Sequence, residues 1–220
     1  MIDVLHLDKK DRHGDQRDAM LEVVLKHIEI KDGDAILDVG CGLGVFLEAI
    51  KNPTVAKTGI DIDPECIEIS KSFLPDADLR VADACTLPFR DESFNILTAM
   101  CILEHVDNPR AMVKEMYRVC KKGGLVIFST PNIGRPLRLM LATQKKRKFD
   151  HLGHKQGWDY HLLMHLLESN GWKVERIVTR FVDCPFYWQI PRFIGNFMSH
   201  KLLPKIFPWV GSELYAFCRK

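Results

Sequence analysis

The chain has 220 residues, of which 46% are hydrophobic and 27% are charged, and this balance is typical of one globular domain with a substantial core. The formal net charge of +2 is close to neutral and by itself argues neither for nor against a nucleic-acid partner, although a domain built for phosphates is usually more basic. We expect no nucleic-acid partner. The seven cysteines are odd in number and lack C-x-x-C spacing, which argues against a disulfide framework or zinc knuckle and favours a reducing, cytoplasmic location.

The first 34 residues are expected to form an irregular polar segment over about residues 1–14, one helix and a turn. Charges crowd residues 3–12 with no long apolar core, so we expect no signal peptide. No uncharged apolar run reaches about 18 residues, which predicts no transmembrane helix. A helix is expected over about 15–29, and residues 31–34, Lys-Asp-Gly-Asp, are expected to turn the chain into a strand.

Residues 36–47 are the most informative stretch, because they predict a buried strand, a glycine turn and the start of a helix over about 45–51. Ile36, Leu37 and Val39 are apolar, as in a strand covered on both faces. Three glycines follow at alternate positions, Gly40, Gly42 and Gly44. Glycine accepts positive φ and has no Cβ, so the backbone can turn sharply and let a ligand lie against it. The pattern is typical of a nucleotide site at the carboxyl end of a first parallel strand.

An acidic residue closes the next strand, which is expected over about 54–60. In a βαβ unit a carboxylate at this place can accept both ribose hydroxyls of a bound nucleoside, and Asp61 is the candidate. The alternative is that Asp61 or Asp63 only caps the helix expected over 64–73, and we assign that capping role to Asp63.

The rest of the chain continues to alternate strands and helices. Asn108 and Pro109 signal a helix start, and Gly123 and Gly124 place glycine where a helix C-cap favours positive φ. The alternation predicts a parallel, doubly wound α/β sheet. The expected strands are 78–81, 94–100 and 125–129, and the expected helices are 108–119 and 159–169.

Several independent motifs follow one another in a single order between about residues 36 and 132. They are Leu-Asp-Val-Gly-Cys-Gly, Gly-Ile-Asp-Ile-Asp, Ala-Asp-Ala, Leu-Pro-Phe, Leu-Glu-His-Val, Lys-Gly-Gly and Ser-Thr-Pro-Asn. Together they resemble the class I methyltransferases that use S-adenosylmethionine (SAM), of the small-molecule type and the ubiquinone and menaquinone group. The resemblance implies a Rossmann-like, mostly parallel seven-stranded sheet with its last strand antiparallel, and residues 174–179 and 213–219 fit its strands six and seven. It also implies one methyltransferase domain over residues 1–220, and SAM as the methyl donor, which leaves S-adenosylhomocysteine.

The resemblance also implies which residues hold the cofactor. Asp83 ends a strand, where its side chain can bond the adenine amino group while the Ala84 amide meets a ring nitrogen; the alternative is a turn aspartate. The implied cofactor-binding set is Asp38, Gly40, Cys41, Gly42, Gly44, Asp61, Ile62, Asp83, Ala84 and Met100. A rival assignment, an NAD-linked oxidoreductase, is disfavoured because Val45 stands where a dinucleotide fingerprint has its third glycine.

His105 is the candidate catalytic residue, because it follows a strand at the carboxyl edge of the sheet, next to Glu104. It would act as a general base or as a contact for the acceptor, the alternative being a structural role. Some quinone O-methyltransferases that resemble this segment hold a divalent ion with Glu-x-x-Glu-His. Here Cys101 stands in place of the first glutamate and removes a hard oxygen ligand, so we expect no metal.

Four further histidines lie between residues 151 and 165. His151 and His154 belong to an expected lid insertion over 133–157 and could face the acceptor. The alternative for the four consecutive basic residues 145–148 of this insertion is a solvated loop. His161 and His165 are four apart on a helix, a spacing that can bind zinc, but no acidic pattern completes a site. We therefore expect these two to be surface residues.

Residues 181–210 hold eight of the twenty aromatic residues of the chain and four of its prolines. We expect this segment to form an apolar wall over the acceptor pocket or to touch lipid, the alternative being core packing or a dimer surface. The sequence thus predicts methyl transfer from SAM to a small, apolar acceptor through oxygen or carbon. A non-catalytic SAM-binding or interaction module is the alternative, methylation of protein or RNA also stays open, and nothing in the sequence indicates an oligomeric state.

Overall fold

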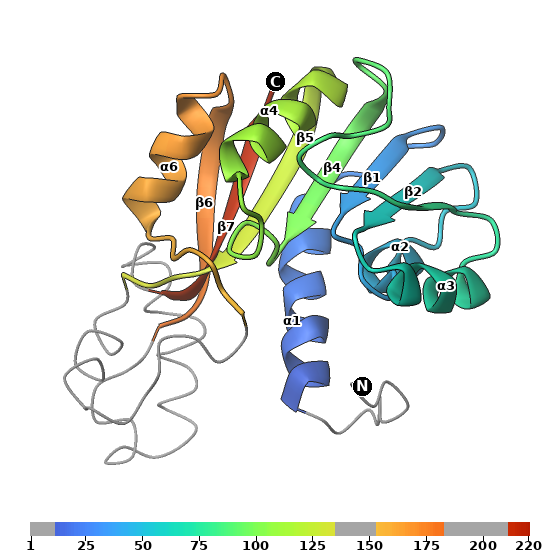
Figure 1. Ribbon diagram of the computed structural model, residues 1–220, viewed down its shortest axis with the longest axis horizontal. Helices are drawn as coiled ribbons and strands as arrows, with labels where there is room; N and C mark the ends of the chain where they lie inside the picture. The colour runs from blue at the N-terminus through green and yellow to red at the C-terminus, as the bar shows by residue number, and fades with distance from the viewer. Residues whose placement is uncertain (1–11, 135–152, 183–210) are drawn as a thin grey trace.

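The computed structural model describes residues 12–134, 153–182 and 211–220 (Figure 1). The lid insertion expected over 133–157 therefore falls mostly outside the described residues, as do nearly all of residues 181–210. The helices are α1 (Arg12–His27), α2 (Val45–Ala49), α3 (Pro64–Phe73), α4 (Pro109–Val119) and α6 (Tyr160–Glu168). The strands are β1 (Ala35–Val39), β2 (Ala56–Asp61), β3 (Asp78–Val81), β4 (Phe94–Met100), β5 (Cys120–Pro131), β6 (Lys173–Val182) and β7 (Gly211–Arg219).

The strands form one seven-stranded sheet in the order β3-β2-β1-β4-β5-β7-β6. Strands β1 to β5 pair in parallel, whereas β7 is antiparallel to both of its neighbours, β5 and β6. Strand β7 therefore lies inside the sheet, between two strands that precede it in the chain. This arrangement confirms the predicted doubly wound, mostly parallel sheet with its last strand antiparallel.

The sheet separates the buried apolar side chains into two clusters, because successive side chains of a strand point to opposite faces. Leu37 and Val39 of β1 belong to the cluster that includes the buried residues of α4 and α6. Ile36 belongs to the other cluster, with buried residues of α1, α2 and α3. The helices accordingly flank the sheet in Figure 1. Both faces of β1 are thus covered, which explains why it is apolar at consecutive positions.

Polar side chains begin the helices where the sequence predicts them. Asp63 caps α3 by accepting a hydrogen bond from the Glu65 amide, and Asn108 caps α4 through the Ala111 amide. These contacts confirm the capping role assigned to Asp63. Asp159 caps α6 in the same way, through the amide of Leu162.

The predicted glycine cap at the end of α4 is wrong. The helix ends at Val119, and Cys120 already has extended backbone and begins β5, although Gly123 does have a φ of 73°. The reason is that the last carbonyls find partners elsewhere. The amides of Glu92 and Ser93 donate to the carbonyls of Arg118 and Val119, at 3.0 and 2.8 Å.

The strand order reverses between β1 and β4, and in doubly wound sheets ligands bind at the carboxyl ends of the strands at such a point. Helix α1 lies beside these strand ends (Figure 1). Its Met20 sulfur is 3.9 Å from the Cys101 sulfur and 3.7 Å from the Ser129 hydroxyl. Among the described helices, none is both long and apolar enough to span a membrane.

Candidate functional site

The glycine turn connects β1 to α2 and leaves its outer side open. The Gly40 and Cys41 amides both donate to the Ile60 carbonyl, which fixes the turn against β2. At Gly44, φ is +77° and a Cβ would lie 2.5 Å from Leu74 Cδ1, so only glycine fits without movement. At Gly42, φ is +51° and a Cβ would meet nothing within 4 Å. The turn is therefore packed on its Gly44 side and free to receive a ligand on its Gly42 side.

Asp61, the predicted ribose ligand, is fixed at the edge of this turn. Its Oδ2 atom accepts a hydrogen bond from the Gly42 amide at 2.8 Å, and its Oδ1 atom accepts one from the Asp63 amide at 3.0 Å. A carboxylate offers about four lone-pair sites, so each oxygen keeps acceptor capacity for a further donor. The ribose role is compatible with this geometry and stays a prediction.

Two adjoining cavities lie at this edge of the sheet. The larger has a volume of about 520 Å³ and the smaller about 330 Å³, and Gly40 lines both. The predicted cofactor residues that line the larger cavity are Gly40, Asp61, Ile62, Asp83 and Ala84. Those that line the smaller one are Asp38, Gly40, Cys41, Gly42 and Met100. Of the predicted set, only Gly44 lines neither, because it is packed against Leu74.

Asp38 is buried at the floor of the smaller cavity. Its Oδ1 atom accepts a hydrogen bond of 2.7 Å from the hydroxyl of Thr98 on the neighbouring strand β4. Burial raises the pKa of the carboxyl from 3.8 to about 7, and nearby Asp61 adds to the rise, while the Thr98 hydrogen bond opposes it. Ionisation of the Asp38 carboxyl is therefore unfavourable in this buried position.

Asp83 has both features that the sequence left as alternatives. Its Oδ1 atom accepts a hydrogen bond from the Cys85 amide at 2.8 Å, which is the contact of a turn aspartate. Its side chain is also exposed and lines the larger cavity beside Ala84. The turn contact therefore holds the carboxylate at the cavity wall, and the adenine role stays a prediction.

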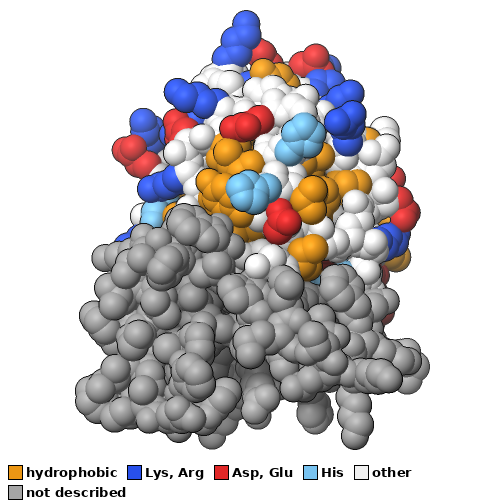
Figure 2. Space-filling view, turned by 90° about the vertical axis from the view of Figure 1, so that its left-hand side faces the viewer, with side chains coloured by type: hydrophobic (Ala, Val, Ile, Leu, Met, Phe, Trp, Pro, Cys, Tyr) orange, Lys and Arg blue, Asp and Glu red, His pale blue; other side chains and the backbone are white. Residues whose placement is uncertain are grey.

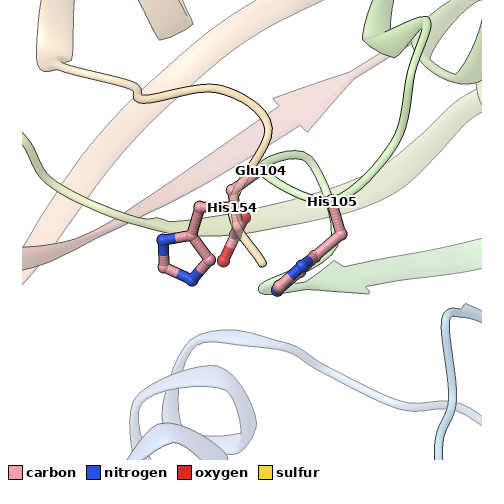
Figure 3. A group of neighbouring side chains, drawn as sticks. All are labelled: Glu104, His105 and His154. Atoms are coloured by element: carbon pink, nitrogen blue, oxygen red, sulfur yellow. The ribbon is translucent and has the colours of Figure 1, made fainter. Parts of the chain in front are cut away.

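His105 lines the larger cavity and is part of a three-residue group (Figure 3). One ligand atom each from Glu104, His105 and His154 lies within 4.8 Å of the others. The two imidazole rings have centroids 4.9 Å apart and meet nearly edge to face, at 79°. Glu104 and His105 follow β4, whereas His154 comes from the segment that precedes α6. The structure thus joins the predicted catalytic histidine to a histidine about fifty residues away in the chain.

The Glu104 side chain is buried, with an exposed fraction of 2%. Its Oε2 atom accepts a hydrogen bond from the Thr130 hydroxyl at 3.0 Å, whereas Oε1 has no hydrogen-bond partner among the described residues. Burial raises the pKa of this carboxyl to about 7, the Thr130 hydrogen bond lowers it, and Glu213 raises it further.

Cys101, which lines the larger cavity, does not belong to this group. Its backbone has a φ of 51°, and its amide donates to the Ser129 carbonyl at 3.0 Å. Its sulfur lies 3.9 Å from the Met20 sulfur and 3.7 Å from the Ser129 hydroxyl, at the contact with α1. Burial raises the pKa of the thiol to about 12, so it is neutral near pH 7.

The other three histidines considered from the sequence are His151, His161 and His165. His161 and His165 are exposed on α6, which confirms that they are surface residues. Figure 2 views this side of the molecule and shows histidine and carboxylate groups among exposed hydrophobic side chains. On α6 itself, Leu162 lies next to His161 in the chain and is 48% exposed. His151 lies outside the described residues.

The sequence did not point to four residues that line these two cavities. Met20 and Leu21 of α1 line the smaller cavity, and Lys155 and Ile102 line the larger one. Their placement depends on how distant segments pack, so the sequence carries no local signal for it.

Comparison with known proteins agrees with this arrangement. Residues 37–128 match the family model described as a methyltransferase domain. The chain is 32% identical over 157 residues to a ubiquinone biosynthesis O-methyltransferase of Coxiella burnetii, covering 68% of this chain and 67% of that protein. It is 29% identical over 140 residues to a demethylmenaquinone methyltransferase of Renibacterium salmoninarum, covering 62% of this chain and 59% of that one.

The fold is also that of known methyltransferase structures. A SAM-dependent methyltransferase from Thermotoga maritima superposes with a TM-score of 0.66 at 19% identity, covering 91% of this chain and 87% of that chain. Sequence motifs, fold and relatives therefore agree: the chain belongs to the class I SAM-dependent methyltransferases.

Proposed function

We propose that this protein transfers the methyl group of SAM to a small apolar acceptor bound beside His105, at an oxygen or a carbon atom. One observation supports this most. Two adjoining cavities at the carboxyl ends of the parallel strands collect nine of the ten predicted cofactor residues, and His105 lines the same wall. Donor and acceptor would thus share one continuous site.

The walls of the two cavities fit the two halves of SAM. In the larger cavity Ile62 is 73% exposed and stands next to Asp61, so an apolar purine can cover the isoleucine while the ribose hydroxyls donate to the carboxylate. In the smaller cavity the open side of Gly42 leaves room for the methionine part against the backbone. We place the sulfonium between them, near Gly40, which lines both.

The names of the relatives support an apolar acceptor. Two of them are a ubiquinone biosynthesis O-methyltransferase and a demethylmenaquinone methyltransferase, and the chain spans 67% and 59% of their lengths. We propose an acceptor of similar character, a ring compound with a hydroxyl group or an activated ring carbon. It would enter the larger cavity along Ile102 and Val106, on the side where His105 lies.

The reaction needs alignment more than it needs a strong catalyst, because the sulfonium already activates the methyl group. The methyl–sulfur bond breaks as a bond forms from the methyl carbon to the acceptor atom, and the acceptor proton is released, leaving S-adenosylhomocysteine. Holding the three reacting atoms in line, away from water, supplies the acceleration. We propose that His105 contributes by contacting the reacting atom of the acceptor.

Calorimetric titration with S-adenosylhomocysteine, with NAD as the parallel ligand, is the first test. We expect micromolar binding of the first and none of the second. Transfer of labelled methyl groups from SAM to a panel of apolar hydroxylated ring compounds then tests the acceptor class. Binding of neither nucleoside by folded protein would contradict the proposal, and binding without transfer to any acceptor would favour a non-catalytic module.

The role of His105 is tested separately. His105→Ala should abolish most of the turnover while S-adenosylhomocysteine affinity stays within about twofold, because the imidazole acts on the acceptor side. His161→Ala is the matched control, since that histidine is exposed on α6 and away from both cavities. Unchanged turnover in His105→Ala would assign this histidine a structural role.

A further inference from the structure

We infer that the end of the sheet opposite the proposed methyl-transfer site holds a second binding site, for a small, multiply charged oxyanion such as a phosphate or carboxylate compound. A cavity of about 450 Å³ lies at this edge. It is the edge beside the C-terminus in Figure 1, from which the β4 arrow points away. Among the residues that the structure describes, this cavity shares none with the two cavities assigned to SAM and the acceptor.

Strand register explains why distant parts of the chain meet at this edge. Arg219 near the end of β7 pairs with Leu125 in β5 on one side and with Lys173 at the start of β6 on the other. Ile96 near the start of β4 also pairs with Leu125. Four residues between positions 27 and 34, where α1 connects to β1, line the cavity as well. The amino ends of the parallel strands and the α1–β1 connection therefore enclose one space.

The cavity has an apolar floor and a charged rim. The floor contains Ile96, Leu125 and Phe217, which are all buried. The rim carries more cations than carboxylates. They are Lys31, Lys121, Lys122, Arg176 and Arg219 on one side of the balance, and Glu29, Asp34 and Glu175 on the other. A volume of about 450 Å³, an apolar floor and a few charged groups are typical of a small-molecule site.

Two of the three carboxylates are already engaged by neighbouring groups. The Asp34 Oδ2 atom accepts a hydrogen bond from the Lys31 amide at 2.8 Å. A carboxylate oxygen of Glu175 lies 3.5 Å from the Nε atom of Arg219. Glu29 is the third carboxylate and is exposed at the rim. The lining therefore keeps a surplus of positive charge, which favours an anionic ligand.

Three lysines of the rim have hydrogen-bonding capacity for such a ligand. Lys31 and Lys122 are exposed, and neither ammonium group forms an ion pair within the described parts of the chain. The Nζ atom of Lys121 donates to the Asn95 side-chain oxygen at 2.9 Å, so this ammonium group stays charged and keeps two donors. Hydrogen bonds from ammonium groups to phosphate or carboxylate oxygens are charge-assisted and are therefore among the strong ones.

Arg176 is oriented by two contacts that leave donors free. Its guanidinium carbon lies 4.7 Å from the centre of the Phe217 ring, and its Nη2 atom donates to the His27 carbonyl at 3.1 Å. The His27 ring packs on the same phenylalanine, with ring centroids 5.3 Å apart. A guanidinium group has five N–H donors in a fixed plane, so the remaining ones can bind an oxyanion from a pre-set orientation.

Helix α1 lines this cavity and also the smaller cavity at the other edge of the sheet. Met20 and Leu21 line the proposed methionine site, and His27 lines the anion cavity. The helical rise places Met20 and His27 roughly 10 Å apart along the axis. An anion that bridges Lys31 and Arg176 would hold the end of α1 against β6, and with it a wall of the cofactor cavity. We therefore expect the anion to tighten cofactor binding, an effect that rests on the proposed function, whereas anion binding itself does not.

The test is calorimetric titration of the full chain with sodium pyrophosphate and, separately, with sodium citrate, at an ionic strength of about 0.15 M. Saturating S-adenosylhomocysteine keeps the probes out of the cofactor cavity. We expect a single site with a dissociation constant below about 1 mM for at least one probe. The probe that binds more tightly assigns the ligand to the phosphate or to the carboxylate class. No binding of either probe by the folded protein would overturn the inference.

Charge changes of opposite sign locate the site. Lys31→Ala and Lys122→Ala should each weaken binding of the tighter probe by about 2–5-fold, whereas Glu29→Gln should strengthen it by about twofold, because it removes a repulsive charge. All three side chains are exposed, so these changes remove no core contact. Lys114→Ala is the matched control, since it removes the same charge from an exposed position on α4 outside the cavity. An equal loss in the control, or weaker binding in Glu29→Gln, would overturn the placement.

The link through α1 is tested by titrating S-adenosylhomocysteine with and without the tighter probe at saturation. We expect at least about threefold tighter cofactor binding when the anion is bound, and linkage requires the same factor in the anion affinity when the cofactor is bound. Equal cofactor affinities would contradict the link and leave the anion site standing. No cofactor binding in either titration would contradict the proposed function, while pyrophosphate or citrate binding would still decide the anion site.

Discussion

The carboxylate of Asp61 accepts a hydrogen bond from the backbone amide of Gly42 at 2.8 Å, across the edge of the sheet from β2 to the glycine turn. Asp61 therefore has two roles in the proposed function, one structural and one in cofactor binding. It holds the turn in place, and it offers its remaining lone pairs to the ribose of SAM. Removing it should affect the cofactor site more than a lost ribose contact alone would.

We predict that Asp61→Ala weakens S-adenosylhomocysteine binding by roughly 1–3 kcal/mol, the range for a lost hydrogen bond to a charged group. Calorimetry measures this directly. Asp63→Ala is the matched control, because Asp63 caps α3 two residues away, and its loss should lower stability by about 1 kcal/mol with little effect on affinity. Equal affinities for the wild type and Asp61→Ala would refute the ribose assignment.

The buried carboxyl of Asp38 predicts a pH dependence of stability. Its pKa rises from 3.8 to about 7 on folding, so the native state favours the protonated form. The stabilisation from this group is complete below about pH 4 and is lost as the pH rises through about 7, by about 1.4 kcal/mol per pH unit at most. Asp38→Asn should therefore lose less stability than the wild type between pH 5 and pH 8.

Melting temperatures across this pH range measure the effect. Asp76→Asn serves as the control, since Asp76 is exposed and its replacement should leave the wild-type pH profile unchanged. Parallel profiles for wild type and Asp38→Asn would show that Asp38 is charged in the folded protein throughout the range.

Alanine substitutions at Gly33 and Gly44 distinguish the cost of left-handed backbone strain from the cost of steric overlap by the added Cβ. Gly33 and Gly44 both have a φ of +77°, but a Cβ at Gly33 would meet nothing within 4 Å, whereas one at Gly44 would lie 2.5 Å from Leu74 Cδ1. Gly33→Ala should cost about 1–2 kcal/mol from the left-handed backbone alone. Gly44→Ala should cost about 1–3 kcal/mol more, because Leu74 must move. Urea unfolding of both variants measures the difference, and equal losses would show that Leu74 yields freely.

Arg118 should stabilise the loop before β4. Its guanidinium group makes two hydrogen bonds of 2.8 Å to the Glu115 carboxylate, one of 2.7 Å to Asp91, and two to the carbonyls of Leu87 and Phe89. We predict that Arg118→Ala lowers the free energy of unfolding by about 1–3 kcal/mol, because the half-buried loop carbonyls lose a charged donor.

Urea unfolding tests this, and hydrogen exchange should show faster exchange of the loop amides. Arg110→Ala on the same helix is the control, because Arg110 is exposed, and it should change stability by less than about 0.5 kcal/mol. A loss in Arg118→Ala no larger than in the control would mean that the loop is held by its apolar contacts alone.

Helix starts were predictable from the sequence because their signals are local. An aspartate or asparagine followed by proline, as at Asp63 and Asn108, satisfies the first free amides from within the same turn. Strand β1 was equally predictable from the sequence, because both of its faces are covered and its residues are therefore apolar at consecutive positions. The antiparallel β7, by contrast, came from the family resemblance and not from any feature of residues 213–219.

The parts that could not be predicted depend on distant contacts. Helix α4 ends at residue 119 as expected, but Gly123 and Gly124 do not cap it, because Cys120 already begins β5 and the amides of Glu92 and Ser93 satisfy the last helix carbonyls. His154 could be suspected of facing the acceptor, but its place beside Glu104 and His105 depends on how Lys155 and Gln156 bond to the turn after β4. Such contacts join segments about fifty residues apart, and periodicity within one segment contains no information on them.

The position of β7 also constrains the order in which the sheet can be assembled during synthesis. Residues 211–219 are made after β5 and β6, yet they fill the gap between them. Until they emerge, β5 and β6 each present an unpaired edge, and exposed strand edges of this kind recruit other chains. A fragment truncated before residue 211 should therefore aggregate rather than fold, and a nascent chain would gain most from chaperone protection in the interval between completing β6 and releasing β7.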